Sequence, residues 1–408
     1  MTSGAVQSRP AQRDAPGGDD FADRFGGGVL VSAMLVCAIV GLAFYLFDAP
    51  SRFWFFPNSV AEAKAEDFAA YYRAGAMVAE GLTAKTYQPD LFRAGLGPEN
   101  QHLLMLNPPH FFFFAELLSQ ADYGTAKRLC LLGVPLVFLA LGLICRQPWF
   151  MCLMLMASGA AYYAVITLNV SALAIVFIVF ALTQARAHPL LSGVALALAT
   201  VKPQYGILVP VFLLACGHWR AFIYASVASL ALFAVSVLVY GLEAWSAYFG
   251  IFSDPIYKDY LQENLEASLT IRHSVGKLGG PMWLQWGLQG AAICAAAVMV
   301  WLGASRWSQP MHTGLTLMAA GLVAPSLFFY CWPLFLAGLC LVLTVRSPWP
   351  LMTQALAGLL WIQPVLTIFI YNLDKGVALY YSAFIPALAV LTIMAFIKMA
   401  EERRDIAV

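Results

Sequence analysis

Apolar runs of about twenty residues recur along this chain, and they constrain its fold more than any other feature. A helix needs roughly twenty apolar residues to cross the hydrocarbon core of a bilayer. We therefore predict an all-α polytopic membrane helix bundle of about 12 transmembrane helices. The runs that qualify are 29–47, 103–120, 127–145, 149–168, 170–185, 190–216, 220–240, 282–304, 312–327, 328–345, 350–371 and 377–399. The regions 149–185 and 312–345 are ambiguous, because each fits one long helix or two short ones.

The composition supports an integral membrane protein. Charged residues make up 11% of the chain, whereas a soluble domain has about 25%. The net charge of +1 argues against nucleic-acid binding, which relies on clustered Lys and Arg. The eight cysteines lie in or beside apolar runs without a CxxC pair, and no HExxH motif occurs, so we expect neither a disulfide framework nor a metal.

The distribution of basic residues predicts the orientation, because cytoplasmic loops carry an excess of Lys and Arg. With the N-terminus inside, the opposing short loops hold only Arg146, Arg186 and Lys375. Both termini are then cytoplasmic, as a disordered tail at 1–28 and a short tail at 400–408 that flank a membrane domain at 29–399. Its long outer loops are 48–102 and 241–281. The basic residues placed on the cytoplasmic side are Arg9, Arg13, Arg24, Lys127, Arg128, Arg220, Arg306, Arg346, Lys398, Arg403 and Arg404.

The sequence offers no site for a nucleotide or another cofactor. It contains no Walker A motif and no GxGxxG following a strand. An activated group would therefore come from a substrate already in the membrane, or energy from a gradient. No convincing internal repeat is visible, which weakens the interpretation as an inverted-repeat transporter.

Asp67 is the leading catalytic candidate, at the start of a short amphipathic helix in the first outer loop. Tyr71 and Arg73 follow it in the same segment. One interpretation is that Asp67 is an N-cap that accepts bonds from free backbone N–H groups. The other is a general base, which must reach an acceptor hydroxyl directly or through one water. A cap also fixes where a carboxylate points, so the two roles conflict only partly.

Two proline-containing motifs add polar candidates. Asn107 and His110 flank Pro108-Pro109 at the start of the second apolar run, which predicts either substrate contacts or an ordinary helix start. Lys202-Pro203-Gln204 lies inside 190–216, where a charge is costly and indicates function by default. We interpret Lys202 as an anion partner; the alternative is a shorter helix from which it snorkels.

Later outer segments add the remaining candidates. Arg272 and Lys277, with His273 between them, are suited to holding a phosphate, although solvated charges near lipid headgroups explain them equally well. Tyr330 belongs to an aromatic segment after Pro325-Ser326. Its ring can stack on a sugar or belong to an interfacial aromatic belt, and the belt is the commoner role.

Taken together, four of these stretches resemble glycosyltransferase family 87, a branch of the GT-C superfamily that includes bacterial phosphatidylinositol-mannoside mannosyltransferases. Departures at Glu266-Ala267 and Ala324 leave the sugar and the acceptor open. The four stretches are Asp67-Phe68-Ala69-Ala70-Tyr71-Tyr72-Arg73-Ala74-Gly75 with Gly81 and Tyr87 after it, Asn107-Pro108-Pro109, Lys202-Pro203-Gln204, and Pro325-Ser326.

The resemblance implies transfer of a mannose-like hexose from a polyprenyl-phosphate donor to a hydroxyl of a glycolipid or glycan, with inversion. It implies a GT-C fold in the cell inner membrane, with the site facing the periplasm or the cell exterior and Asp67 as the base. The alternatives are a transporter or lipid flippase of envelope biogenesis, and a non-catalytic assembly subunit. The candidate substrate-binding residues are Tyr71, Arg73, Asn107, His110, Lys202, Gln204, Arg272, His273, Lys277 and Tyr330.

Overall fold

The computed structural model describes residues 27–47, 59–64, 66–263, 268–345 and 349–406, and the predicted tail at 1–28 lies almost wholly outside them. Helices form all the regular elements of this described part, and one antiparallel bridge joins Ser268 to Phe328. The α-helices are α2 (Gly28–Phe47), α4 (Asp67–Ala79), α5 (Pro89–Arg93), α6 (Phe112–Ser119), α7 (Tyr123–Ile144), α8 (Trp149–Met156), α9 (Gly159–Thr167), α10 (Ser171–Gln184), α11 (Pro189–Ala199), α12 (Val209–Ala215), α13 (Trp219–Tyr240), α14 (Leu242–Ile251), α15 (Pro255–Glu263), α16 (Ile271–Lys277), α17 (Met282–Arg306), α18 (Gln309–Val323), α19 (Pro333–Leu343), α20 (Leu351–Leu373), α21 (Lys375–Ala383) and α22 (Ile385–Ile406). The 3₁₀ helices are η1 (Val60–Glu62), η2 (Thr83–Tyr87), η3 (Pro98–Asn100), η4 (Pro109–Phe111), η5 (Pro203–Gly206) and η6 (Phe329–Cys331).

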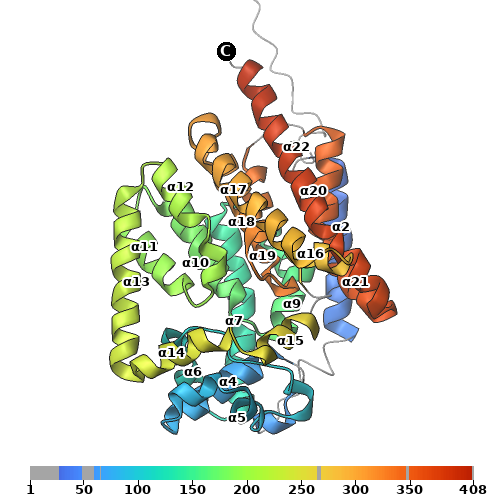
Figure 1. The fold of residues 1–408 in the computed structure, drawn as a ribbon. Helices are drawn as coiled ribbons and strands as arrows, with labels where there is room; N and C mark the ends of the chain where they lie inside the picture. The colour runs from blue at the N-terminus through green and yellow to red at the C-terminus, as the bar shows by residue number, and fades with distance from the viewer. Residues whose placement is uncertain (1–26, 48–58, 65, 264–267, 346–348, 407–408) are drawn as a thin grey trace, which may run out of the picture.

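The long helices form a bundle, and a layer of short helices lies across one end of it (Figure 1). We call this layer, which consists of α4, α5, α6, α14 and α15, the cap. Its core is separate from that of the bundle and is rich in aromatic side chains such as Phe68, Phe112 and Trp245. The cap is therefore a folded unit that the bundle carries at one end.

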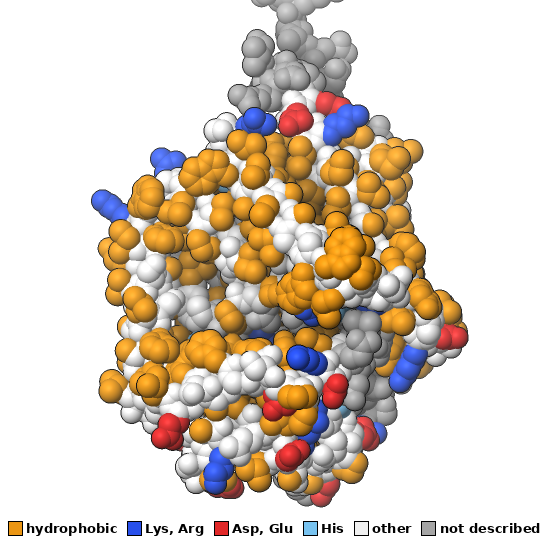
Figure 2. Space-filling model, in the orientation of Figure 1, with side chains coloured by type: hydrophobic (Ala, Val, Ile, Leu, Met, Phe, Trp, Pro, Cys, Tyr) orange, Lys and Arg blue, Asp and Glu red, His pale blue; other side chains and the backbone are white. Residues whose placement is uncertain are grey.

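A band of hydrophobic side chains crosses the face of the bundle seen in Figure 2, with charged side chains gathered beyond both of its edges. Leu132 of α7 and Leu230 and Leu238 of α13 are between 68% and 85% exposed. Such a surface is stable only against lipid, because water would disfavour so large an apolar area. The protein is a multi-pass membrane protein.

Fewer helices than expected are long and apolar enough to span a bilayer. The described residues contain five, or six if the bent α8–α9 pair, with an angle of 51°, forms one span. The predicted number of twelve is thus not confirmed. The five are Tyr123–Ile144, Trp219–Tyr240, Met282–Arg306, Leu351–Leu373 and Lys375–Glu402.

The expected span at 103–120 is wrong. Its only α-helix is α6, which has eight residues, and Phe112 and Ala115 on that helix are fully buried. Gly75 of α4 packs against the backbone of Ala115, so α6 belongs to the cap. The run is apolar in large part because residues such as Phe111 and Phe112 fill the aromatic core of the cap.

The apolar run 190–216 is likewise not one helix but the hairpin α11–η5–α12. It breaks where Pro203 lacks an N–H and forces Lys202 out of helical geometry, with φ −134° and ψ 72°. The region 312–345 forms a second hairpin, α18–η6–α19. The turns of both hairpins face the cap (Figure 1). Residues of both turns line one cavity together with Asp67 and Tyr248 of the cap.

Because 103–120 does not span the membrane, four basic residues lie at the opposite end of the bundle from the one expected. Lys127 was expected on the side opposite Asp67, but its Nζ lies 2.7 Å from Oε2 of Glu66, the residue before Asp67. Lys127 and Arg128 therefore lie at the cap end. Arg146 and Arg186, expected on the cap side, follow the ends of α7 and α10 away from it.

The N-terminal end of α2 and the C-terminal part of α22 both lie beside the start of α20, at the bundle end opposite the cap. The backbone N–H of Val29 donates to Gln354 in the first turn of α20, and Trp349 just before α20 packs against Phe396 of α22. Helices α2 and α22 thus have their outer ends on the same side of the bundle. Arg9, Arg13, Arg24 and Arg346 lie outside the described residues.

The buried Glu66–Lys127 pair gives a prediction about stability. The two side chains are 5% and 2% exposed, and the Tyr123 hydroxyl also donates to Glu66. We expect Lys127→Met to lower the free energy of unfolding by about 3–5 kcal/mol, because it leaves Glu66 buried without its counter-charge. Thermal unfolding of the purified protein in detergent measures this change.

Lys398→Met is the matched control. Lys398 lies 3.8 Å from Glu402, and these side chains are 79% and 55% exposed. An exposed helical pair contributes about 0.5 kcal/mol or less. Equal unfolding temperatures for the two variants would contradict the role given to Lys127.

Candidate active site

A cavity of about 580 Å³ lies where the cap meets the bundle. Its walls come from α4, the segment before η4, the α9–α10 connection, both hairpin turns, α14, α15, α16 and α17. Seven of the eleven candidate site residues line it, and the other four do not. The seven are Asp67, Tyr71, Asn107, Lys202, Gln204, Arg272 and Tyr330.

Asp67 is the first residue of α4 and lines the cavity. The N-cap of α4 is Glu66, and Asp67 Oδ2 accepts a hydrogen bond of 2.7 Å from Asn169 Nδ2. The interpretation of Asp67 as an N-cap is therefore wrong. The adjacent carboxylates have different partners: Glu66 contacts Lys127 inside the protein, whereas Asp67 lines the cavity.

Asn169 fixes the position of this carboxylate. It follows Leu168, whose φ of 47° ends α9 in left-handed geometry. Its Oδ1 accepts from the backbone N–H of Ser171 at 2.9 Å and from the Ser171 hydroxyl at 2.5 Å. These contacts leave the Asn169 amide N–H groups facing Asp67.

Burial raises the pKa of Asp67 above its ordinary value. The hydrogen bond from Asn169 and the charges of Lys202 and His102 oppose this rise without cancelling it. A carboxylate with a raised pKa is a stronger proton acceptor in its ionised form.

Lys202 lies at the turn of the α11–α12 hairpin and is 8% exposed. Its ammonium group lies over the ring of Tyr330, 5.8 Å from the ring centre. Within the described part of the chain, no carboxylate lies within 4.0 Å of it. The helix before Lys202 is shorter than the apolar run, as the alternative interpretation predicted. Lys202 nevertheless lines the cavity and does not snorkel to the edge of the apolar band.

Arg272 supplies a second cation to the same cavity. Its guanidinium carbon lies over the Trp286 ring, 4.3 Å from the ring centre, and Nη2 donates to His273 Nε2 at 2.6 Å. Because a guanidinium only donates, His273 accepts at Nε2 and carries its proton on Nδ1. That nitrogen lies 2.5 Å from Ser268 Oγ and 2.7 Å from Thr270 Oγ1.

His273 and Lys277 support the site without lining the cavity. Burial and the neighbouring charges of Arg272 and Lys277 lower the pKa of His273 to about 3, which keeps it neutral. Lys277 Nζ donates to the carbonyl of Ser268 and to Ser382 Oγ. Their contacts hold the segment that carries Arg272.

Arg73 and His110 also lie away from the cavity. The Arg73 guanidinium packs beside Gly95, and His110 contacts Thr200 Oγ1 at 3.1 Å and stacks on Trp245. Asn107 does line the cavity, and its Nδ2 donates to the Val201 carbonyl at 3.0 Å. The polar groups of the Asn107–His110 motif thus fasten the cap to the α11–α12 hairpin.

The sequence analysis missed several residues that line the cavity, including Asn169, Tyr257, Tyr260 and Trp286. Asn169 is a polar residue at the break between two apolar runs, which was an available signal. Tyr257 and Tyr260 are three residues apart on α15, so they share one face of a helix. The described residues contain no group of three His, Cys, Asp or Glu side chains that could hold a metal.

The family model described as Glycosyltransferase family 87 matches residues 106–333, which is more than half of the chain. No curated protein and no solved structure gave a match. The matched region includes Asn107, Lys202, Arg272 and Tyr330, whereas Asp67 precedes it.

Proposed function

Since this chain belongs to glycosyltransferase family 87, we propose that it transfers a mannose-like hexose from a polyprenyl-phosphate donor to an acceptor hydroxyl, with inversion. The membership makes the protein an enzyme that transfers a sugar. The proposed donor and mechanism rest on one observation. A single cavity has the Asp67 carboxylate on the side of the cap and Lys202 and Arg272 on the side of the bundle.

This arrangement suits a direct displacement at the anomeric carbon. The acceptor oxygen bonds to that carbon as its bond to the phosphate oxygen breaks, and Asp67 takes the acceptor proton. Lys202 and Arg272 stabilise the negative charge that builds on the departing lipid phosphate. Attack from the side opposite the phosphate inverts the configuration, which requires base and cations on opposite sides of the sugar.

A second pocket supports a lipid-linked donor. It has a volume of about 580 Å³, is lined mostly by apolar residues of α10, α11, α12 and α13, and shares Lys202 and Pro203 with the Asp67 cavity. We call it the tail groove. In the donor, a phosphate lies between an apolar chain and a sugar; here Lys202 lies between an apolar groove and a polar cavity.

Aromatic side chains give the cavity a surface for the sugar. Tyr248, Tyr257, Tyr260 and Tyr330 line it on the cap and bundle sides. Aromatic faces pack against the apolar face of a sugar ring, while their hydroxyls meet its polar edge. We propose that they, with Gln204 and Asn107, hold the hexose.

We further propose that the cap faces the periplasm or the cell exterior, in the cell inner membrane. The exposed cations Arg146, Arg186, Arg220 and Arg306 lie at the opposite end, as the positive-inside rule favours for a cytoplasmic surface. A glycolipid or glycan would supply the acceptor hydroxyl. Family membership does not favour the transporter or flippase alternative.

The first prediction concerns the base. Asp67→Asn keeps an oxygen that can accept the bond from Asn169 but cannot take a proton, so we expect transfer to fall by about 10²–10⁴-fold. The measurement is sugar transfer from a radiolabelled polyprenyl-phosphate hexose in proteoliposomes. Asp90→Asn is the matched control, because Asp90 is exposed in the cap and does not line the cavity. Wild-type activity in Asp67→Asn would rule out the base.

The second prediction concerns pH. The base must be ionised, so kcat/KM should fall as the pH decreases through the pKa of Asp67. Because burial raises that pKa, the acid limb should lie above pH 3.8, the ordinary value for aspartate. A rate profile measured from neutral to acidic pH tests this. An acid limb that persists unchanged in Asp67→Asn would assign it to another group.

The third prediction tests the tail groove. Ser229 lines the groove from α13, so Ser229→Trp should fill it and raise KM for a long-chain donor by about tenfold. A donor analogue with one or two isoprene units should be affected much less. Leu238→Trp, on the same helix but 85% exposed, is the control. Equal losses with both donors in Ser229→Trp would contradict the groove assignment.

A further inference from the structure

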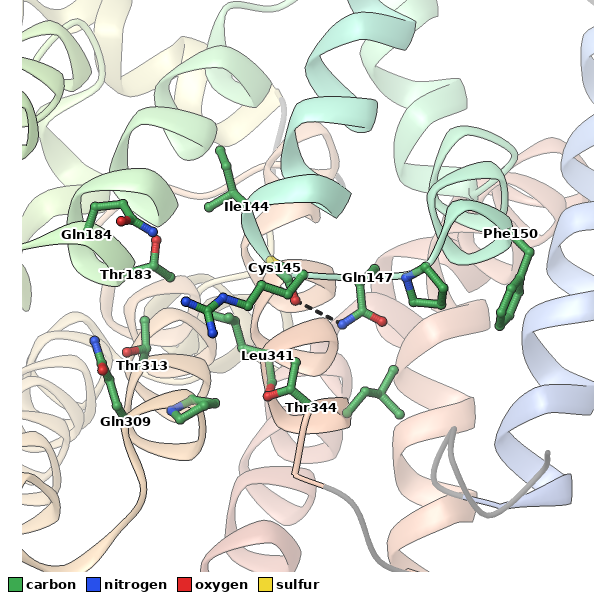
Figure 3. A pocket seen from close by; sticks show the side chains of 14 residues that line it. Ile144, Cys145, Gln147, Phe150, Thr183, Gln184, Gln309, Thr313, Leu341 and Thr344 are labelled. Carbon is green, nitrogen blue, oxygen red and sulfur yellow. Dashed lines mark hydrogen bonds between the residues drawn. The ribbon is translucent and has the colours of Figure 1, made fainter. Parts of the chain in front are cut away.

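A pocket of about 700 Å³ lies at the bundle end opposite the cap (Figure 3). It forms where α7, α10 and α19 end and where α8 and α18 begin. Its volume is within the roughly 300–1,000 Å³ typical of ligand sites and exceeds that of the Asp67 cavity. The proposed transfer reaction makes no use of it.

Half of the residues that line this pocket are polar, and one of them carries a charge. Thr183 and Gln184 lie across the pocket from Gln309 and Thr313 (Figure 3). Gln147 is held by donating to the carbonyls of Cys145 and Cys340. Arg146 is the one charged residue among the described lining residues, which include no carboxylate. A site with donors and an unopposed cation favours an anion.

Thr313 has a feature that the fold alone leaves unexplained. It is 1% exposed, and its hydroxyl has no hydrogen-bond partner within the described part of the chain. A buried hydroxyl without a partner is destabilising, and a ligand in the pocket that bonds to Thr313 removes this cost. Arg146 directly follows the C-cap of α7, and its left-handed φ of 56° belongs to that helix end, where the Gln147 N–H donates to the Gly142 carbonyl.

The surroundings indicate where such a ligand comes from. At this end of the bundle, charged side chains gather beyond the edge of the hydrophobic band (Figure 2). Arg186, Arg220, Arg306 and Lys398 are exposed at this end of the bundle. Basic residues at a membrane surface attract anionic lipid headgroups.

We propose that this pocket binds the phosphate of an anionic phospholipid headgroup from the leaflet at that end. Arg146 supplies a charge-assisted bond to the phosphate. The Thr313 hydroxyl donates to a phosphate or headgroup oxygen, and the side-chain amides of Gln184 and Gln309 bond to the remaining polar atoms.

Native mass spectrometry of the full-length protein in detergent tests the proposal, with phosphatidylglycerol and zwitterionic phosphatidylcholine as probes. We expect phosphatidylglycerol to bind about tenfold more tightly than phosphatidylcholine. Arg146→Asn, which keeps a residue that tolerates left-handed geometry, should weaken phosphatidylglycerol binding about tenfold. The control Arg186→Asn, an exposed residue outside the pocket, should change binding less than twofold.

A second variant separates binding from folding. Thr313→Val removes the hydroxyl at nearly constant volume, so it should weaken phosphatidylglycerol binding while leaving the unfolding temperature equal or higher. Sugar transfer by Arg146→Asn confirms that this variant is folded. Displacement of the lipid by millimolar inorganic phosphate would assign the site to a free anion. Equal binding of the two lipids, or wild-type binding by both variants, would overturn the proposal.

Discussion

Where a helix ends inside an apolar bundle, its free backbone N–H and C=O groups need hydrogen-bond partners. The way in which this chain supplies those partners determines the arrangement of the site. Three apolar runs are interrupted at the level of the cavity, and a side chain or a strand-like backbone contact closes each interruption. Asn107 of the cap donates to the Val201 carbonyl, and Gln289 of α17 donates to the Val323 carbonyl. The backbone N–H of Leu269 donates to the Leu327 carbonyl, and Asn169 bonds to Ser171 after α9.

These closures bring functional groups from distant parts of the sequence to one place. Asn169 closes the α9–α10 break and also holds Asp67, while the α11–α12 break places Lys202 beneath the cap. The cap contributes the carboxylate and the bundle contributes the cations. The neighbouring Glu66 shows why position decides the role, since its charge is neutralised by Lys127 and is unavailable to a substrate.

The apolar pattern predicted the class of fold but not how the chain crosses the membrane, and polar motifs predicted seven residues that line the cavity. Hydropathy cannot distinguish aromatic residues that fill a cap, such as Phe111 and Phe112, from residues that face lipid, so 103–120 was misassigned. That one error also reversed the side of Lys127. Lys202 was singled out because a charge inside an apolar run is costly, and Arg272 because a guanidinium suits a phosphate; both line the cavity. Asn169 was missed because its partner Asp67 is distant in the sequence. His273 was expected to contact the substrate, but it lies outside the cavity and accepts a hydrogen bond from Arg272, which a sequence pattern does not show.

The most direct measurement is a cryo-electron microscopy structure with a polyprenyl phosphate bound. The account predicts phosphate oxygens about 3 Å from Lys202 Nζ and from the Arg272 guanidinium, with the isoprenoid chain in the tail groove. The space between the phosphate and Asp67 would then admit one hexose and the attacking hydroxyl. A phosphate bound outside this cavity, with Asp67 out of reach of the anomeric carbon, would contradict it.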